Sequence, residues 1–137
     1  MLTDEMRAFL EEPRFASLAT LNASGTIQQT VMWYKLRGDR IVMNTARGRA
    51  KDRNLRRDPR ISICVEDGYR YLTIAGEADL IDDPEIAQAD IAELATRYHG
   101  AEQAAAMVRD SFGGQERVTL VLPIGRVVAA GFDGNEG

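Results

Sequence analysis

Hydrophobic residues follow two different periods along this chain. Over much of the first half, apolar and polar positions alternate with a period of two, which is typical of strands with one buried face. Clusters of turn-forming residues around Gly25, Gly38 and Gly68 divide this alternation into segments. With a late apolar stretch included, six segments are predicted as strands: Phe15–Leu21, Thr26–Leu36, Arg40–Asn44, Arg60–Val65, Tyr69–Ile81 and Arg117–Val128.

Other segments have the spacing and the end signals of helices. A short helix with the N-cap Thr3 precedes the first strand, and Arg49–Arg57 is predicted as a second helix because Pro59 ends the helical pattern. The main helical region opens at the N-cap Asp83, breaks at Gly100 and then continues. One short helix is therefore inserted between strands, and a longer helical region comes before the last strand.

Six antiparallel strands with helices at their margins predict a mainly β fold. A small closed sheet or barrel is expected, since an open sheet of this length would expose its edges. Gly76 is expected to form a bulge, and Pro123 indicates an edge or a bulge in the last strand. Residues 1–137 are predicted to form a single domain. The glycine-rich, acidic end of the chain, Gly131–Gly137, is predicted to be disordered.

The composition is that of a soluble globular protein, with 45% hydrophobic and 28% charged residues. No apolar run approaches the roughly 20 residues that a membrane-spanning helix needs, and the first residues lack the character of a signal peptide. The expected location is the cytoplasm. The single cysteine, Cys64, lies in an apolar run, and the single histidine, His99, has no potential co-ligand near it in sequence, so no metal site is predicted.

The charge pattern adds a candidate site, because a basic run stands out on a chain whose net charge is −4. Residues 44–60 hold seven of the seventeen Lys and Arg residues: Arg47, Arg49, Lys51, Arg53, Arg56, Arg57 and Arg60. The run begins at the turn before the second predicted helix. Unpaired N–H groups and the positive end of the helix dipole meet at such a helix start, which favours an anion.

Spacing suggests which side chains would hold that anion. Arg47 and Lys51 are four residues apart and can converge on the same oxygens, with a hydroxyl from Thr45. The alternative is a charged face in water. Nucleic acid is not expected as the ligand, because the chain is acidic and has no second basic patch.

The order of segments resembles the pyridoxamine-phosphate-oxidase-like split β-barrel proteins, and among them the flavin and deazaflavin oxidoreductases that use coenzyme F420. The likeness covers nearly the whole chain and rests on these stretches: Phe15–Leu21, Gln28–Tyr34, Asp39–Thr45, and the pattern Arg49-Ala50-Lys51, Asn54-Leu55, Asp58-Pro59-Arg60. The resemblance implies a six-stranded antiparallel split barrel with peripheral helices. It also implies a homodimer with two cofactor sites at the interface.

The resemblance also implies a set of cofactor-binding residues. The phosphate would be held after the third strand, the ring would lie along the second strand, and a tyrosine region would come from across the dimer. The corresponding residues are Asn44, Thr45, Arg49, Ala50 and Lys51, then Thr30, Val31, Met32 and Trp33, then Tyr69 and Tyr71. Residue chemistry adds Arg47 at the phosphate, Gln28 at the polar edge of the ring and Arg57 toward a longer acidic tail.

Two side-chain directions follow from strand geometry. Trp33 and Tyr34 are neighbours on a strand and face opposite sides, so one is expected in the core and the other can line a pocket. Tyr69 and Tyr71 are expected on one face, where a plain cross-strand aromatic pair is the alternative to a ligand contact.

The implied function is an F420-dependent reductase that transfers hydride to a small conjugated acceptor such as a quinone, enone or tetrapyrrole. An FMN-dependent oxidoreductase of the same fold and a non-catalytic cofactor-binding protein are the alternatives. Arginines after Lys51 (Arg53, Arg56 and Arg57) favour F420, whose oligoglutamyl tail is acidic, unless they simply face water. No catalytic residue is assigned, because the cofactor carries the chemistry in this family.

Overall fold

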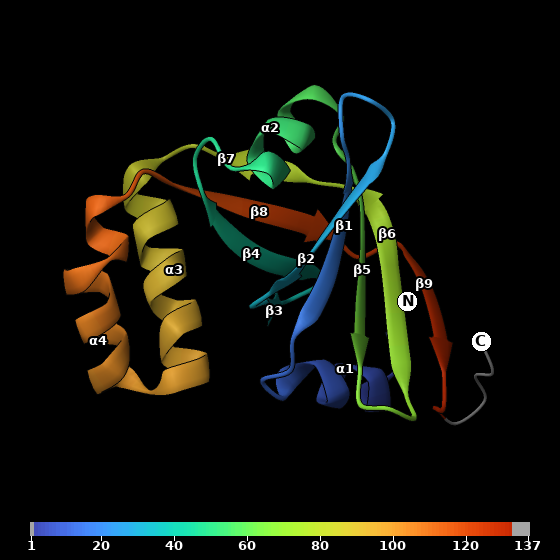
Figure 1. Ribbon diagram of the computed structural model, residues 1–137. Helices are drawn as coiled ribbons and strands as arrows, with labels where there is room; N and C mark the ends of the chain where they lie inside the picture. Colours follow the sequence, from blue (N-terminus) through green and yellow to red (C-terminus); the bar gives the residue numbers. More distant parts are fainter. Residues whose placement is uncertain (1, 133–137) are drawn as a thin grey trace.

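The computed structural model describes residues 2–132, which form two antiparallel sheets with helices around them (Figure 1). The helices of this part of the chain are α1 (Asp4–Glu11), α2 (Ala50–Arg57), α3 (Pro84–His99), α4 (Ala101–Asp110) and a 3₁₀ turn, η1 (Phe112–Gly114). The strands are β1 (Ala16–Leu21), β2 (Ile27–Met32), β3 (Lys35–Arg37), β4 (Arg40–Ala46), β5 (Arg60–Glu66), β6 (Tyr71–Glu77), β7 (Asp79–Ile81), β8 (Arg117–Pro123) and β9 (Arg126–Ala130). The mainly β class is as predicted.

The predicted count of six strands is wrong in detail, because three of the six are each divided in two. The five-stranded sheet has the order β2-β1-β5-β6-β9, and the four-stranded sheet has the order β3-β4-β8-β7. The divided strands give the pairs β2 with β3, β6 with β7, and β8 with β9, and each pair passes from one sheet to the other. A period of two persists through such a bend, so the sequence pattern does not show where the hydrogen-bonding partner changes.

The bends lie where the local sequence interrupts pairing. Pro123 ends β8, since proline has no N–H to donate to a sheet. Ala78 separates β6 from β7, two residues beyond Gly76, where a Cβ atom would lie 3.2 Å from Leu122 Cδ1 of β8. The predicted irregularities at Gly76 and Pro123 are therefore close to real strand ends.

The hydrophobic core lies between the sheets. Strand β1 alternates buried and half-buried positions as predicted, whereas the first six residues of β8 are all buried. The reason is that α3 packs over β8 and β4 on the outer side of the four-stranded sheet, and α4 lies against α3 (Figure 1). Strand β8 is thus covered on both faces.

Several predicted helix ends are confirmed. The Thr3 hydroxyl accepts from the N–H of Met6, and the Asp83 carboxylate accepts from two N–H groups at the start of α3. Helix α2 ends at the predicted Asp58-Pro59 step, and the break between α3 and α4 falls at Gly100, which has a positive φ of 85°.

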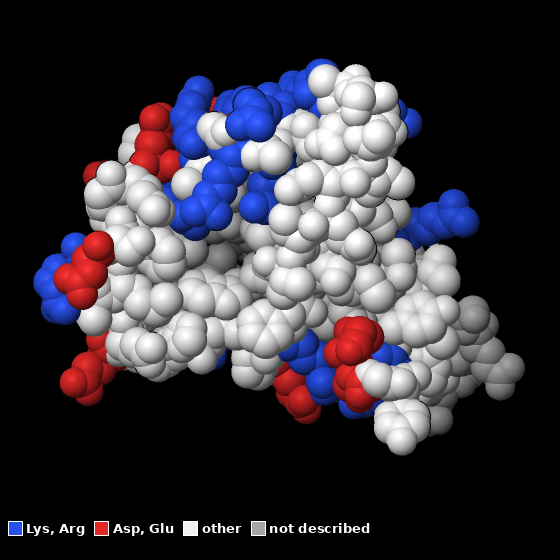
Figure 2. Space-filling model, viewed as in Figure 1, with Lys and Arg blue, Asp and Glu red and all other residues white. Residues whose placement is uncertain are grey.

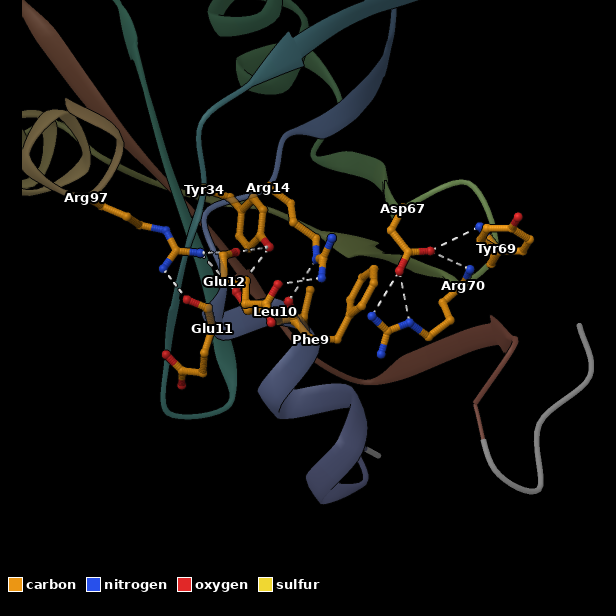
Figure 3. Close-up of polar contacts among 10 residues, drawn as sticks. All are labelled: Phe9, Leu10, Glu11, Glu12, Arg14, Tyr34, Asp67, Tyr69, Arg70 and Arg97. Carbon is orange, nitrogen blue, oxygen red and sulfur yellow. Dashed lines mark hydrogen bonds and ion pairs between the residues drawn. The ribbon is translucent and has the colours of Figure 1, made fainter.

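The carboxyl end of α1 is held by side chains from distant parts of the chain (Figure 3). The hydroxyl of Tyr34 donates to the carbonyl oxygens of Leu10 and Glu12 at 3.0 and 3.2 Å. The guanidinium of Arg97 on α3 donates to carbonyl oxygens of the same segment and lies 5.2 Å from the Tyr34 ring. Burial raises the pKa of Tyr34 to about 12.

The last described residues are ordered against α1, since Phe132 packs edge-on against Phe9 with 5.2 Å between ring centroids. The remainder of the predicted disordered end, residues 133–137, lies outside the described residues. Within residues 2–132 no helix has both the length and the apolar character that crossing a membrane requires.

We expect Tyr34→Phe to lower the free energy of unfolding by about 1–2 kcal/mol, because the buried hydroxyl that bonds the end of α1 is lost. Urea denaturation of the variant and the wild type measures this difference. Tyr69→Phe is the control, since Tyr69 is 91% exposed. Equal midpoints for Tyr34→Phe and the wild type would contradict the proposed role of the hydroxyl.

Candidate functional site

A cavity of about 270 Å³ lies between the end of β2, the inner strands of the four-stranded sheet and α3. Its lining combines aromatic, apolar and basic side chains: Val31, Met32, Trp33, Asn44, Arg49, Ile91, Leu94, Ser111, Phe112, Gln115 and Arg117. Carboxylates and histidines are missing from this set of described residues. The cavity therefore suits a planar or apolar group that carries negative charge at one end.

Three cations, which we call the cradle, gather beside this cavity: Arg49, Lys51 and Arg117. Arg49 is the N-cap residue of α2, Lys51 lies in its first turn, and Arg117 begins β8. The register of β4 with β8 places Arg117 opposite Ala46, so Arg117 stands next to the turn that leads into α2. The sheet pairing thus brings a residue from late in the chain to the basic helix start.

Burial and mutual repulsion act on the cradle. Lys51 is 7% exposed and Arg117 is 8% exposed. Burial, and then Arg49 and Arg117, lower the pKa of Lys51, while burial and Arg49 lower the pKa of Arg117 to about 10. Between residues 2 and 132, no carboxylate forms an ion pair with any of the three. Cations held together in this way favour an anion as their partner.

The backbone adds donors at the same place. The first N–H groups of an α-helix have no partner within the helix, and in α2 no N-cap side chain satisfies them. The nearest acid, Asp52, accepts from the N–H of Gly48 at 2.7 Å and from Arg56 Nε at 2.9 Å. Figure 2 shows a patch of Lys and Arg residues in the same region, over α2 and the turn before it.

The guanidinium of Arg117 is held in a defined orientation. Its Nε donates to Asn44 Oδ1 at 2.9 Å, and its Nη1 donates to Gln115 Oε1 at 2.7 Å. Its central carbon lies 5.0 Å from the centre of the Phe112 ring. These contacts fix the group without neutralising its charge.

Arg47 does not share the environment of Lys51, contrary to the predicted convergence of the two. Arg47 forms ion pairs with Asp82 and Glu116, with N–O distances of 3.3 and 3.4 Å. The physical reason is that these acids come from segments distant in sequence, which local spacing cannot reveal. Arg117, and not Arg47, is the second cation that lowers the pKa of Lys51 together with Arg49.

Asn44 and Thr45 also separate, because successive side chains of a strand face opposite sides. Asn44 lines the cavity and donates to the Ala87 carbonyl of α3 at 2.9 Å. Thr45 is 3% exposed and alternates with Asn44, so its hydroxyl lies on the other face of β4. The structure therefore does not support a shared contribution of Thr45 and Arg47 to one anion.

The predicted ring-binding strand reaches the cavity with its last residues. Val31, Met32 and Trp33 line it, while Tyr34 is fully buried in the core, as the predicted opposite directions require. Strand β2 is an edge strand, so one side of its backbone has no strand partner.

Gln28 and Thr30 occupy positions earlier on β2. Gln28 accepts from Thr20 Oγ1 at 3.5 Å across to β1. Thr30 carries a buried hydroxyl that has no hydrogen-bond partner among the described residues. An unsatisfied buried hydroxyl needs an explanation, such as a missing ligand contact.

The remaining predicted residues lie elsewhere. Arg57 donates to Leu21 O and to Asn54 Oδ1 beside the β1–β2 turn. Tyr69 belongs to the exposed turn of Asp67 and Arg70 near α1, where Figure 3 shows it, and Tyr71 begins β6. None of these three residues lines the cavity of its own chain.

Sequence patterns did not indicate six residues of the cavity lining, which are Ile91, Leu94, Ser111, Phe112, Gln115 and Arg117. A weak signal was available, since Arg117 stands directly before a mainly apolar strand and such a position is costly for an arginine with no function. Only the pairing of β8 with β4 brings it to Lys51's helix.

Comparisons with known proteins agree with this architecture. A family model described as pyridoxamine 5′-phosphate oxidase matches residues 2–127. A conserved hypothetical protein from Mycobacterium tuberculosis superposes with a TM-score of 0.80 at 29% identity, over 94% of this chain and 84% of that one. A structure described as an F420 reductase gives a TM-score of 0.74 at 27% identity, over 92% and 98% of the two chains.

A more distant match is the heme storage protein HutZ from Vibrio cholerae, with a TM-score of 0.72 at 20% identity over 96% of each chain. This likeness shows the fold alone. Because the family model covers nearly the whole chain, the predicted resemblance is confirmed, and the chain belongs to the pyridoxamine 5′-phosphate oxidase family.

Proposed function

We propose that this protein is an F420-dependent reductase that transfers hydride to a small conjugated acceptor such as a quinone, enone or tetrapyrrole. One observation carries the proposal: three cations that pair with no carboxylate among residues 2–132, Arg49, Lys51 and Arg117, adjoin a cavity with aromatic walls. Such a site fits a ligand with a phosphate at one end and a planar ring system at the other.

The residues present fit such a cofactor. Its phosphate would meet the cradle and the free N–H groups at the start of α2. Its ring would lie between Trp33 and the unpaired backbone edge of β2. The unpartnered hydroxyl of Thr30 is a polar group on that strand which a bound ring or water can satisfy.

The choice between deazaflavin and flavin depends on the arginines that follow Lys51. Arg56 is neutralised by Asp52 and Asp82, so it is not available to an acidic tail. Arg53 and Arg57 donate to backbone carbonyl groups and form no ion pair within the described chain. These two favour the oligoglutamyl tail of F420, as does the 27% identity to a protein described as an F420 reductase.

The residues of this chain would bind, orient and enclose the reactants. Reduced F420, when bound, supplies the hydride. The ring centres of Trp33 and Phe112 stand 6.2 Å apart, edge to face, and the two rings would exclude water from one side of a bound ring. Because the described lining contains no Asp, Glu or His, a proton for the acceptor would come from solvent or from outside this chain.

Two alternatives share the same cradle. FMN carries a phosphate and a similar ring, so the FMN-dependent reading rests on the same three cations. A cofactor-binding protein without turnover is favoured by the absence of an acid or base in the described cavity lining.

The proposal includes a homodimer formed through the outer face of the five-stranded sheet. This face is built from small and apolar side chains in cross-strand rows, as in the row Val31, Ser17, Cys64, Thr73 and Val128. Charged residues lie only toward the margins of this face. Protein–protein interfaces likewise have few charged residues at their centre and a polar rim. Val31 belongs to both this face and the cavity, so a second copy here would approach the cofactor. Tyr69 and Tyr71, remote from the cavity of their own chain, would then belong to the partner's site.

We expect Lys51→Ala to raise the Kd for F420 by about tenfold to a hundredfold, because a buried cation of the cradle is lost. Quenching of the fluorescence of Trp33 on titration with F420 measures the affinity. Arg47→Ala is the matched control, since the Arg47 charge is balanced by Asp82 and Glu116.

The same titration with FMN, and with the phosphate-free deazariboflavin and riboflavin, separates the phosphate from the ring. Loss of affinity in Lys51→Ala should be confined to the phosphate-bearing compounds. A wild-type protein that binds neither F420 nor FMN would remove the basis of the proposed function.

The affinity for F420 is expected to fall as the pH rises from 7 toward 9, a range below the pKa of about 10 of Arg117. The pKa of Lys51 lies below the ordinary value of 10.5, and only the protonated ammonium attracts the phosphate. Binding therefore requires a proton that Lys51 loses earlier than an ordinary lysine would. Lys51→Arg, which keeps its charge over this range, should flatten the profile, and equal slopes for the two proteins would argue against Lys51 as the titrating group.

Ala75→Arg is expected to dissociate the dimer, since Ala75 is exposed on the outer face of β6 beside Arg126 of β9. Sedimentation velocity of the wild type and the variant measures the oligomeric state. Ala105→Arg on α4 makes the same substitution at another exposed alanine and should remain dimeric. A monomeric wild type would refute the homodimer.

A further inference from the structure

A chain of buried hydrogen bonds connects α3 to the cradle. It starts at Asp90, which is 5% exposed and lies in the middle of α3. One oxygen of its carboxylate accepts from Arg37 Nη2 at 3.0 Å, and the other accepts from the hydroxyl of Thr119 at 2.7 Å. Thr119 is fully buried on β8, two residues after Arg117. Asp90 itself does not line the cavity.

The charge of Asp90 sets the direction of every bond that follows. A carboxylate only accepts, so the single hydroxyl proton of Thr119 points to Asp90. Toward Asn44 the Thr119 oxygen can then only accept, and Asn44 Nδ2 donates to it at 3.3 Å. The second hydrogen of this amide goes to the Ala87 carbonyl at 2.9 Å. Asn44 Oδ1 is left to accept from Arg117 Nε, which fixes the guanidinium.

From this arrangement we infer that Asp90 is a positioning residue for the cradle, acting through Thr119 and Asn44 on Arg117. The inference rests on the proposed function, because it concerns the same anion site. It assigns to α3 a part in cofactor binding that contact with the cavity alone does not reveal.

The substitution Asp90→Asn would disturb the directions of these hydrogen bonds, although the two side chains have nearly the same shape. The asparagine amide has one oxygen, which the Arg37 guanidinium attracts while repelling an NH₂ group, so the NH₂ group would face Thr119. The Thr119 hydroxyl would have to donate to Asn44 instead. To accept a hydrogen bond from Thr119, the Asn44 amide would have to rotate by half a turn. Its NH₂ group would then face the Nε–H of Arg117, so two donors would meet. The guanidinium would lose its fixed direction.

Electrostatics alone predicts the opposite result. Removing a negative charge from the neighbourhood of three cations raises the local positive potential and should tighten the binding of an anion. Glu93 provides the matched control, because it pairs with the same Arg37 at 3.0 Å but takes no part in the bonds to Thr119. Asp90→Asn and Glu93→Gln remove the same charge from the same helix.

The test measures F420 affinity by isothermal titration calorimetry for Asp90→Asn and Glu93→Gln, with phosphate-free deazariboflavin as the comparison. We expect a Kd for F420 about tenfold higher in Asp90→Asn, a Kd within about twofold of the wild type in Glu93→Gln, and little change for the phosphate-free compound. Equal Kd values for F420 in the two variants, or tighter binding in Asp90→Asn, would overturn the positioning role.

A double-mutant cycle separates positioning from a general loss of structure. In Arg117→Met, which keeps an unbranched side chain over Phe112, the further change Asp90→Asn should leave the Kd for F420 unaltered. A tenfold effect that persists without Arg117 would show that Asp90 acts by another route and would overturn the inference.

A second pair of variants covers the case in which Asp90→Asn does not fold. Thr119→Val removes the hydroxyl with little change in shape and should weaken F420 binding, whereas Thr119→Ser keeps the hydroxyl and should restore it. Equal affinity in both would overturn the inference. Wild-type protein that binds neither F420 nor FMN would overturn the proposed function and this inference together, whereas wild-type binding with Asp90→Asn unaffected would overturn only the role of Asp90.

Discussion

The pairing of β4 with β8 is the constraint on which the candidate site depends. Its register sets Arg117 opposite Ala46 and Thr119 opposite Asn44, so one pair of strands supplies both a cation of the cradle and the groups that aim it. The cost of burying Arg117 is offset by hydrogen bonds to Asn44 and Gln115, although no carboxylate in the described part of the chain pairs with its charge. A shift of one residue would turn Arg117 to the opposite face of the sheet.

Helix α3 supports this arrangement from outside. It covers the outer face of β4 and β8, and for this reason polar side chains on that face are buried rather than in water. Buried polar groups need partners, and Asp90 and the Ala87 carbonyl of α3 provide them. The same helix binds the end of α1 through Arg97, so it joins the site to the far end of the molecule. The stability of the fold and the proposed cofactor site therefore depend on the same helix.

The fold was largely predictable because its signals are local. Caps such as Thr3 and Asp83, the stop at Asp58-Pro59 and the alternation of β1 depend on neighbours in sequence, and the structure has them where expected. The number of strands was not predictable in the same way. A strand that bends from one sheet to another keeps its period, and only the change of partner divides it.

The sequence by itself determined that a dense basic run meets a helix start, and that a split barrel of this family would place it near a ring-binding strand. Only the tertiary structure decided which of the basic residues remain without a counterion. Arg47 and Arg56 are neutralised by acids such as Asp82 that local spacing does not bring near, whereas Arg117 joins Lys51 from the other end of the chain. Charge is a property of the residue, but whether that charge is available to a ligand depends on which side chains the fold brings within ion-pair distance.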